Sequence, residues 1–467
     1  MPRAAKAEEK SNRAGRRSSA SNKVRRVPKL VIDPAIKSPE SFDPSVTHHF
    51  NYEASGHDEL PHVVKFSGGR SSGMLLFMLL QNKILKAERG DVVVFNNTSA
   101  EHPETYRFAA KCKQVVEETY GIPFFFVQFQ TYEDARGGEW VRLPAYRLVK
   151  PVPGSEEEPD GYSWRGEVFE EMLSLSGYVP NQFQRICTNK LKLEVTRSFL
   201  QDWFACRAGI ERLGHYGAES RMDDEDMYAR HRRKRGGVPR QIFMQKRAYV
   251  RSRPVFRPEQ LFSDYSQAVR PISNPHLRGK RYGNSAFFGK GGVEYVAFVG
   301  LRCDEMHRVI RVRRRNAGGP ESDGYEGEHV YAPLASICVT RENVNAFWSE
   351  QSWNLGLSSD SGLSNCVYCF LKGVRVLQKV HEQMENEKNA QTKGSPSDIN
   401  WWRHMEERYG RDMAAEKREM RSEVKGGVIG FFGARSGFSY KQLAENGEGR
   451  DDISHFSNSV LPCDCTD

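Results

Sequence analysis

The sequence predicts an α/β fold with a doubly wound, mainly parallel sheet and a mainly helical C-terminal region. Short apolar segments alternate with helical segments of ten residues or more, which is the pattern of strand–helix–strand units. The apolar runs are continuous, which is typical of parallel strands covered on both faces. Ligands of such sheets bind at the carboxyl ends of the strands.

The first half of the sheet follows in order from residue 62. The expected strands have runs of Val, Ile and Phe, and cover residues 62–66, 91–97 and 122–129. The expected helices between them cover residues 74–85 and 102–120. Together these segments predict two consecutive strand–helix–strand units.

Later elements are less regular. Residues 130–180 contain Pro151, Pro153 and an acidic run, and are expected to form irregular surface or a lid. A further helix is expected from Asn189 and a strand at residues 295–300. The predicted organisation has five parts, which are a basic, disordered tail and lead-in (1–55), a nucleotide-binding α/β domain (56–205), a basic insertion (206–290), a return to the α/β domain (291–341) and a helical Cys-containing region (342–467).

Composition limits the class of protein. The 467 residues contain no run of 18 apolar side chains, so we expect no membrane partner, and the N-terminus has no apolar segment of a secretory signal. Nine cysteines without an export signal favour reduced thiols and a cytoplasmic location.

The net charge of +9 is concentrated in two segments. Residues 1–30 hold ten Lys or Arg and two acids, and residues 228–257 hold eleven Lys or Arg and no acid. The second segment interleaves its cations with Tyr and Phe, a mixture that suits single-stranded or looped nucleic acid. A solvated basic loop is the alternative. The candidate contacts are Arg232, Arg233, Lys234, Arg235, Lys246 and Arg247.

The turn after the first strand gives the strongest chemical signal. Residues 67–73 read Ser-Gly-Gly-Arg-Ser-Ser-Gly and lie between a strand and a helix. Glycines let backbone N–H groups approach an anion, and the helix directs its positive N-terminal end to the same place. The turn is neither a Walker A loop nor a dinucleotide fingerprint. It therefore predicts a phosphate site of another type.

The cysteines divide into clustered and single residues. Cys366 and Cys369 form a Cys-x-x-Cys pair, and Cys463 and Cys465 lie close together at the C-terminus. This spacing suits Zn²⁺ or a [4Fe–4S] cluster equally, and also a redox-active or incidental pair. The single cysteines, which are expected to be structural, are Cys112, Cys206, Cys303 and Cys338.

The segment FSGGRSSG resembles the PP-loop of the phosphoadenosine phosphosulfate (PAPS) reductase-like family, a Rossmann-like branch of the adenine-nucleotide α-hydrolase superfamily. The segments FNNTSAEHPET, RICTNKLKLE, VGLRCDEMHR, SNCVYCFLKG and NWWRHMEE resemble the same family in the same order. The resemblance implies nucleotide contacts from Ser67, Gly68, Gly69, Arg70, Ser71, Ser72, Thr98 and Glu101. It implies catalytic roles for Arg302, Asp304, Glu305 and Arg308.

The same resemblance favours a [4Fe–4S] cluster over zinc, with Cys187, Cys366, Cys369 and Cys463 as ligands. Such PP-loops commonly carry Asp where this chain has Ser71, which leaves the use of Mg²⁺ open. The Glu-Cys-Gly-x-His tail of the reductases is absent, so the terminal cysteines are expected to be ligands before nucleophiles, with Cys465 a remaining nucleophile candidate.

Three functions follow as hypotheses. The first is an enzyme that binds ATP and carries out adenylation-linked sulfur transfer, with nucleic acid as a candidate acceptor and a sulfur-donor protein as a partner. The second is a PAPS reductase that forms sulfite with a thiol reductant. The third is a non-catalytic nucleic-acid-binding protein with a structural metal.

Overall fold

The computed structural model of the chain describes residues 52, 55–134, 141–181, 184–207, 270–271, 288–289, 292–316, 326–387, 389, 392–412, 428–433 and 438–446. The basic tail, the basic segment 228–257 and the terminal cysteines fall outside these ranges, so their predicted roles stay predictions.

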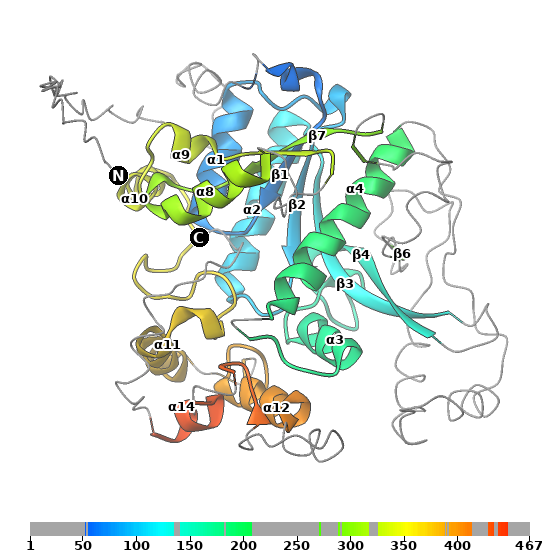
Figure 1. Cartoon of the computed structure of the whole chain (residues 1–467). Helices are drawn as coiled ribbons and strands as arrows, with labels where there is room; N and C mark the ends of the chain where they lie inside the picture. Colours follow the sequence, from blue (N-terminus) through cyan, green and yellow to red (C-terminus); the bar gives the residue numbers. More distant parts are fainter. Residues whose placement is uncertain are drawn as a thin grey trace, which may run out of the picture.

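The described residues form an α/β fold around one large sheet (Figure 1). Seven strands follow the order β5-β4-β3-β2-β1-β7-β8, and β6 pairs with β4 off this path. The parallel centre consists of β1 (His62–Phe66), β2 (Val92–Asn97), β3 (Phe124–Asp134), β7 (Tyr295–Val299) and β8 (Glu328–Tyr331). The other side adds β4 (Val141–Pro153), β5 (Gly161–Tyr162) and β6 (Arg270–Pro271). This arrangement confirms the predicted α/β class.

The strand order reverses at β1, because β2 and β3 lie on one side of it and β7 and β8 on the other. Crevices at such a reversal, outside the carboxyl ends of the strands, are the usual ligand sites of open α/β sheets. The fold therefore directs attention to the residues that follow β1 and β7.

Alternating side chains of β1 face two different helical layers. Phe66 stacks on Phe108 of α2 (Pro103–Tyr120), with ring centroids 6.3 Å apart. Lys65 points to the opposite face, where α4 (Glu194–Arg207) and α8 (Met306–Asn316) cover the sheet. Helix α1 (Arg70–Gln81) follows β1 directly, and eleven of its twelve residues are buried. Such burial explains why its sequence is apolar all round.

The structure corrects the prediction for residues 130–180. Instead of irregular surface or a lid, β3 and β4 form an antiparallel pair from Phe126↔Val149 to Asp134↔Val141, and α3 (Glu167–Ser176) follows. Pro151 and Pro153, which the sequence analysis took as signs of irregular structure, lie in the last three residues of β4. There only the short strand β5 pairs with β4. Proline is tolerated at such positions because few ladder hydrogen bonds are lost there.

The expected helix from Asn189 is present with an irregular start. Residues Thr188–Leu193 form a π-helical turn, η5, and α4 continues from Glu194. Turns of this kind occur frequently at functional sites. Lys192 in this turn lines the pocket of the candidate site.

Most of the C-terminal region packs beneath the carboxyl edge of the sheet, beside α3, whereas residues 341–349 pack against α1 (Figure 1). It contains α10 (Arg341–Ser349), α11 (Val374–Asn386), α12 (Ile399–Tyr409) and α14 (Tyr440–Asn446), with a small ribbon of β9 (Arg411–Asp412) and β10 (Val428–Ile429). Rings of Phe169, Trp402, Phe431 and Tyr440 pack edge to face between these elements. Among the helices that the structure describes, none is long and apolar enough to cross a membrane.

Candidate functional site

Two glycines shape the turn between β1 and α1. Gly68 has φ of +81°, and a Cβ atom there would lie 2.7 Å from Cγ2 of Thr105. Gly69 is the N-cap of α1 and provides no capping side chain. The first N–H groups of α1 therefore lack the side-chain acceptor that Ser, Thr or Asp would supply.

Two serines hold this loop closed. The hydroxyl of Ser67 lies 2.9 Å from the hydroxyl of Ser72, which donates to the carbonyl of Gly69 at 2.9 Å. The N–H of Ser67 also points at Oγ of Ser72, at 3.3 Å. The loop is thus fixed in shape by its own side chains.

The segment after β7 lies against the same loop. A Cβ atom on Gly300 would come within 2.8 Å of the backbone nitrogen of Ser72. Two residues later, Nη1 of Arg302 donates to the hydroxyl of Ser71 at 2.9 Å. Ser71 and Arg302, which are 231 positions apart in the sequence, are therefore in direct contact.

Arg302 belongs to a compact ionic network in the turn η7 (Cys303–Glu305). Its Nε donates to Asp304 at 3.0 Å, and its backbone N–H donates to Glu305 at 3.0 Å. Glu305 also accepts from the guanidinium of Arg308. The four residues with implied catalytic roles thus lie together beside the loop.

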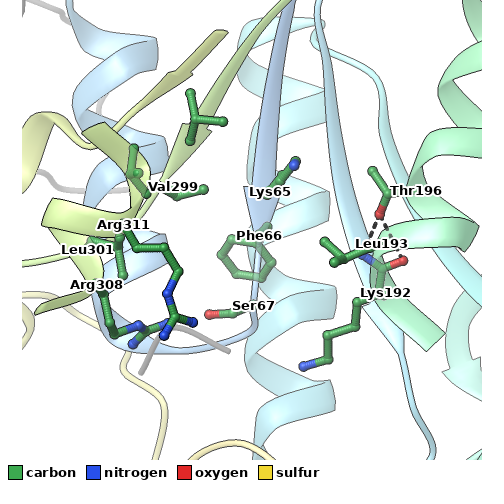
Figure 2. A pocket seen from close by; sticks show the side chains of 13 residues that line it. Lys65, Phe66, Ser67, Lys192, Leu193, Thr196, Val299, Leu301, Arg308 and Arg311 are labelled. Carbon is green, nitrogen blue, oxygen red and sulfur yellow. Dashed lines mark hydrogen bonds between the residues drawn. The ribbon is translucent and has the colours of Figure 1, made fainter. Parts of the chain in front are cut away.

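A pocket opens on the α4–α8 face, at the carboxyl ends of β1, β2 and β7 (Figure 2). Arg308 and Arg311 of α8 reach from one side toward Ser67, and Lys192 reaches from η5 on the other. Lys65 lines the pocket from β1. Apolar lining comes from Phe66, Leu193, Val299, Leu301, Val312 and Val330.

Positive charge exceeds negative charge around this pocket. Lys65 is paired with buried Glu328, and Arg308 is paired with Glu305. The pocket residues include two further cations, Lys192 and Arg311, and no acid. Cations over apolar walls and a helix N-terminus attract an anion with an apolar portion, such as a nucleotide.

Three residues expected to contact a nucleotide make other contacts. The guanidinium of Arg70 donates to Asn354 at 2.9 Å and to the carbonyl of Leu357. Glu101 is buried and accepts from the hydroxyl of Thr98 at 2.7 Å. Arg70 and Glu101 therefore connect the sheet to the C-terminal region in this structure.

The Cys-x-x-Cys pair joins the carboxyl end of β2. Glu101 and Cys366 form a β-bridge, and the N–H of Val367 donates to the carbonyl of Ala100 at 2.9 Å. The sulfur of Cys366 lies 3.6 Å from the hydroxyl of Thr98. Burial raises the pKa of the Cys366 thiol, and the nearby Glu101 carboxylate raises it further. Main-chain pairing thus holds these thiols next to the residues after β2.

A metal site is not complete within the described ranges. No group of three or more His, Cys, Asp or Glu side chains is placed there to hold a metal ion. Cys187 is half-buried at the start of η5, and Cys463 lies outside the description. Cys366 and Cys369 supply a pair of thiols, short of the three or four that zinc or a [4Fe–4S] cluster requires. The cluster stays a prediction.

Three cations of the pocket were missed by sequence reasoning. Lys65 is the one charged side chain in an otherwise apolar strand, and Arg311 lies one helical turn after Arg308. Lys192 belongs to the segment RICTNKLKLE. Charge within a buried strand and the i,i+3 spacing were the available signals.

Comparison with known proteins adds little to this description. A phage lambda protein described as "Uncharacterized nin region protein ORF290" is 29% identical over 147 residues, which is 30% of this chain and 43% of that protein. The chain thus matches less than half of that relative's length. No protein-family model matches the chain, and no solved structure matches it.

Proposed function

We propose that this chain is a PAPS reductase-like PP-loop enzyme, which binds an adenine nucleotide, with ATP favoured, and uses it for adenylation-linked sulfur transfer. The observation that carries the proposal is the contact of Arg302 with the closed Ser67–Ser72 loop, at the point where the strand order reverses. A fixed loop, an uncapped helix start and a guanidinium form a place for a phosphate chain.

The residues around the loop have separate tasks in this proposal. The backbone of Ser67–Ser72 binds the phosphates, and Arg302 positions the loop through Ser71. Arg308 and Arg311 balance the charge that develops on the leaving phosphates. The apolar walls exclude water from the nucleoside portion.

The sulfur chemistry rests on the thiol pair. Cys366 lies 3.6 Å from Thr98, at the carboxyl end of the strand next to β1. A cluster bound there would supply sulfur or electron chemistry to an activated acceptor. Cys366 and Cys369 would hold it together with Cys187 and Cys463, and nucleic acid bound by residues 228–257 is the proposed acceptor.

A reductase is the second candidate, because the cations of the pocket lie on both of its sides. Lys192 and Arg311 line the pocket, and they add two cations to the phosphate contacts that the loop and Arg302 would provide. PAPS carries a sulfate and an extra ribose phosphate, which would match these cations.

Calorimetric binding of Mg·ATP and of PAPS to anaerobically prepared protein tests both candidates. We expect tighter binding of Mg·ATP. Tight PAPS with weak ATP would favour the reductase, and binding of neither nucleotide would contradict both.

The variant Arg311→Ser sharpens the same experiment. It removes one cation from the pocket wall, and a charge-assisted hydrogen bond contributes about 1.5–3 kcal/mol, so the affinity should fall at least about tenfold. The matched control is Arg403→Ser on α12, where the side chain pairs with Glu407 on the surface. Equal affinities of the two variants would contradict a nucleotide in this pocket.

A further inference from the structure

Two thiols outside the Cys-x-x-Cys pair lie beside the supports of the phosphate loop. Cys303 directly follows Arg302, and its N–H donates to the carbonyl of Val339 at 2.9 Å. Cys338 is the residue before Val339, in the turn after α9 (Pro333–Ser336). The backbones that carry the two cysteines are therefore in hydrogen-bond contact.

The two thiols differ in exposure. Cys303 is partly buried, whereas Cys338 is exposed and has φ of +61°, in the left-handed region that Cys rarely adopts. Burial raises the pKa of the Cys303 thiol, and the proximity of Cys338 raises it further, so the two sulfurs are within electrostatic range. Neither forms a disulfide in this structure.

We propose that Cys303 and Cys338 are a redox-sensitive thiol pair that hydrogen peroxide converts to a disulfide. The exposed Cys338 thiolate attacks one peroxide oxygen, the O–O bond breaks, and the hydroxide released takes a proton to become water. The Cys303 sulfur then attacks the sulfenic sulfur, its proton is lost, and the S–O bond breaks with release of a second water. Peroxide is reduced, and both thiols are oxidised.

The disulfide would join two elements that hold the loop. Arg302, next to Cys303, donates to Ser71. Helix α10, which begins three residues after Cys338, places Trp348 so that its indole N–H donates to the carbonyl of Arg70 at 2.8 Å. We expect the approach of the sulfurs to bonding distance to move the turn η7, and with it Arg302 away from Ser71. Oxidation therefore weakens anion binding at the loop, a consequence that rests on the proposed function.

The cross-link itself is tested without any nucleotide. The full chain is treated with hydrogen peroxide, its remaining thiols are blocked, and it is digested with trypsin without reductant. Cleavage at Arg and Lys releases Cys303 in residues 303–308 and Cys338 in residues 316–341, and neither peptide contains another cysteine. We expect mass spectrometry to detect the two peptides as one disulfide-linked species, which dithiothreitol separates into its two parts. If both peptides appear only as unlinked species after peroxide treatment, the proposal is wrong.

The effect on the loop is measured separately. Calorimetry with Mg·ATP should show affinity about tenfold lower for oxidised than for reduced protein, restored by dithiothreitol. Oxidised Cys338→Ser should keep the affinity of its reduced form, because one thiol cannot form the bond. A cross-link in the wild type with unchanged affinity would overturn the coupling to the loop. If reduced protein binds no nucleotide at all, the proposed function fails while the cross-link result stands.

Discussion

At the scale of single residues, Arg302 is the centre of the candidate site. Its guanidinium divides its donors between the hydroxyl of Ser71 and the carboxylate of Asp304. At the loop its partner is the neutral hydroxyl of Ser71, whereas the carboxylates of Asp304 and Glu305 pair with the charge of the guanidinium. Arg302 thus joins the loop to the ionic network of η7.

Substitution Arg302→Lys tests that role. Lysine keeps the charge but cannot reproduce the planar fork that reaches Ser71 and Asp304 together, so nucleotide affinity should fall about tenfold. Calorimetry measures the affinity, and circular dichroism checks that the fold is retained. The control Arg408→Lys changes an exposed arginine of α12 that pairs with Glu170, and should bind like the wild type. Identical affinities of both variants would remove Arg302 from the site.

Sequence reasoning placed the loop residues and Arg302 by motif, and the structure brings them into contact. It did not place Lys65 or Arg311, because a lone charge in a strand and one more arginine in an Arg-rich helix carry no motif. It also assigned Arg70 to phosphate, whereas the structure directs its guanidinium to Asn354. Side-chain direction depends on tertiary neighbours that a local pattern does not contain.

At the scale of elements, the approach of β7 to the Ser67–Ser72 loop depends on the absence of a side chain at Gly300. Gly300 follows β7, and any Cβ atom there would lie 2.8 Å from both the backbone nitrogen and the Cα atom of Ser72. Backbone atoms cannot move aside as a flexible side chain can. Glycine therefore sets the spacing between the end of β7 and the start of α1.

Substitution Gly300→Ala should push these two segments apart and weaken nucleotide binding more than it weakens the fold. We expect at least about a tenfold loss of affinity, with a loss of unfolding free energy of about 1–3 kcal/mol from overpacking. Calorimetry and urea denaturation measure the two quantities. The control Gly177→Ala lies at the end of α3 with φ of +79° and open space around it, so it should affect stability alone. Unchanged affinity of Gly300→Ala would show that the spacing is unimportant.

The strands that could be predicted from the sequence have a more continuous apolar composition than the strand that could not. Strands β1, β2 and β7 are continuous apolar runs, and all three lie within one residue of their predicted limits. Strand β4 mixes Arg, Lys and Pro with its apolar residues, because it pairs at the edge region with the short strands β5 and β6. A strand of this composition contains no continuous apolar segment by which it could be predicted. Its pairing with β3 is a tertiary contact that the local sequence does not encode.

At the scale of the whole molecule, one buried carboxylate joins three parts of the C-terminal region. Glu406 of α12 accepts from the N–H of Phe431 at 3.0 Å and from the N–H of Tyr440 at 2.9 Å, through different oxygens. Burial raises its pKa to about 7. The folded chain therefore binds a proton that the unfolded chain releases above about pH 4.5.

Stability should consequently fall as the pH rises from about 4.5 through about 7, because the contribution of protonated Glu406 is lost above its folded-state pKa. Glu406→Gln should flatten this pH dependence and cost about 1 kcal/mol, since its amide nitrogen faces one of the two N–H donors. Urea denaturation at several pH values, followed by tryptophan fluorescence, measures both effects. The control Glu445→Gln changes an exposed carboxylate of α14 that pairs with Lys441, and should leave the slope intact. An identical slope in Glu406→Gln would contradict the assignment.

The α/β class was predictable from the alternation of segments, but the position of the C-terminal region was not. That position depends on the pairing of Glu101 with Cys366 and on aromatic contacts between residues more than 200 positions apart, such as Phe169 and Trp402. Contacts between residues so far apart in the sequence produce no periodic pattern from which they could be predicted.

The absence of a capping side chain at Gly69, the N-cap of α1, affects the unfolding free energy of the protein without a ligand. A glycine N-cap costs a helix only about a few tenths of a kcal/mol relative to a capping side chain, and Gly69 supplies no side-chain acceptor for the first N–H groups. An anion at that helix end supplies the missing acceptor, so the folded state gains free energy whenever the loop is occupied. By mass action, a ligand at about 100 times its Kd would raise the unfolding free energy by about 2.7 kcal/mol. The melting temperature of the chain thus reports occupancy of the loop, and a panel of nucleotides and simple anions can be ranked by it without knowledge of the reaction.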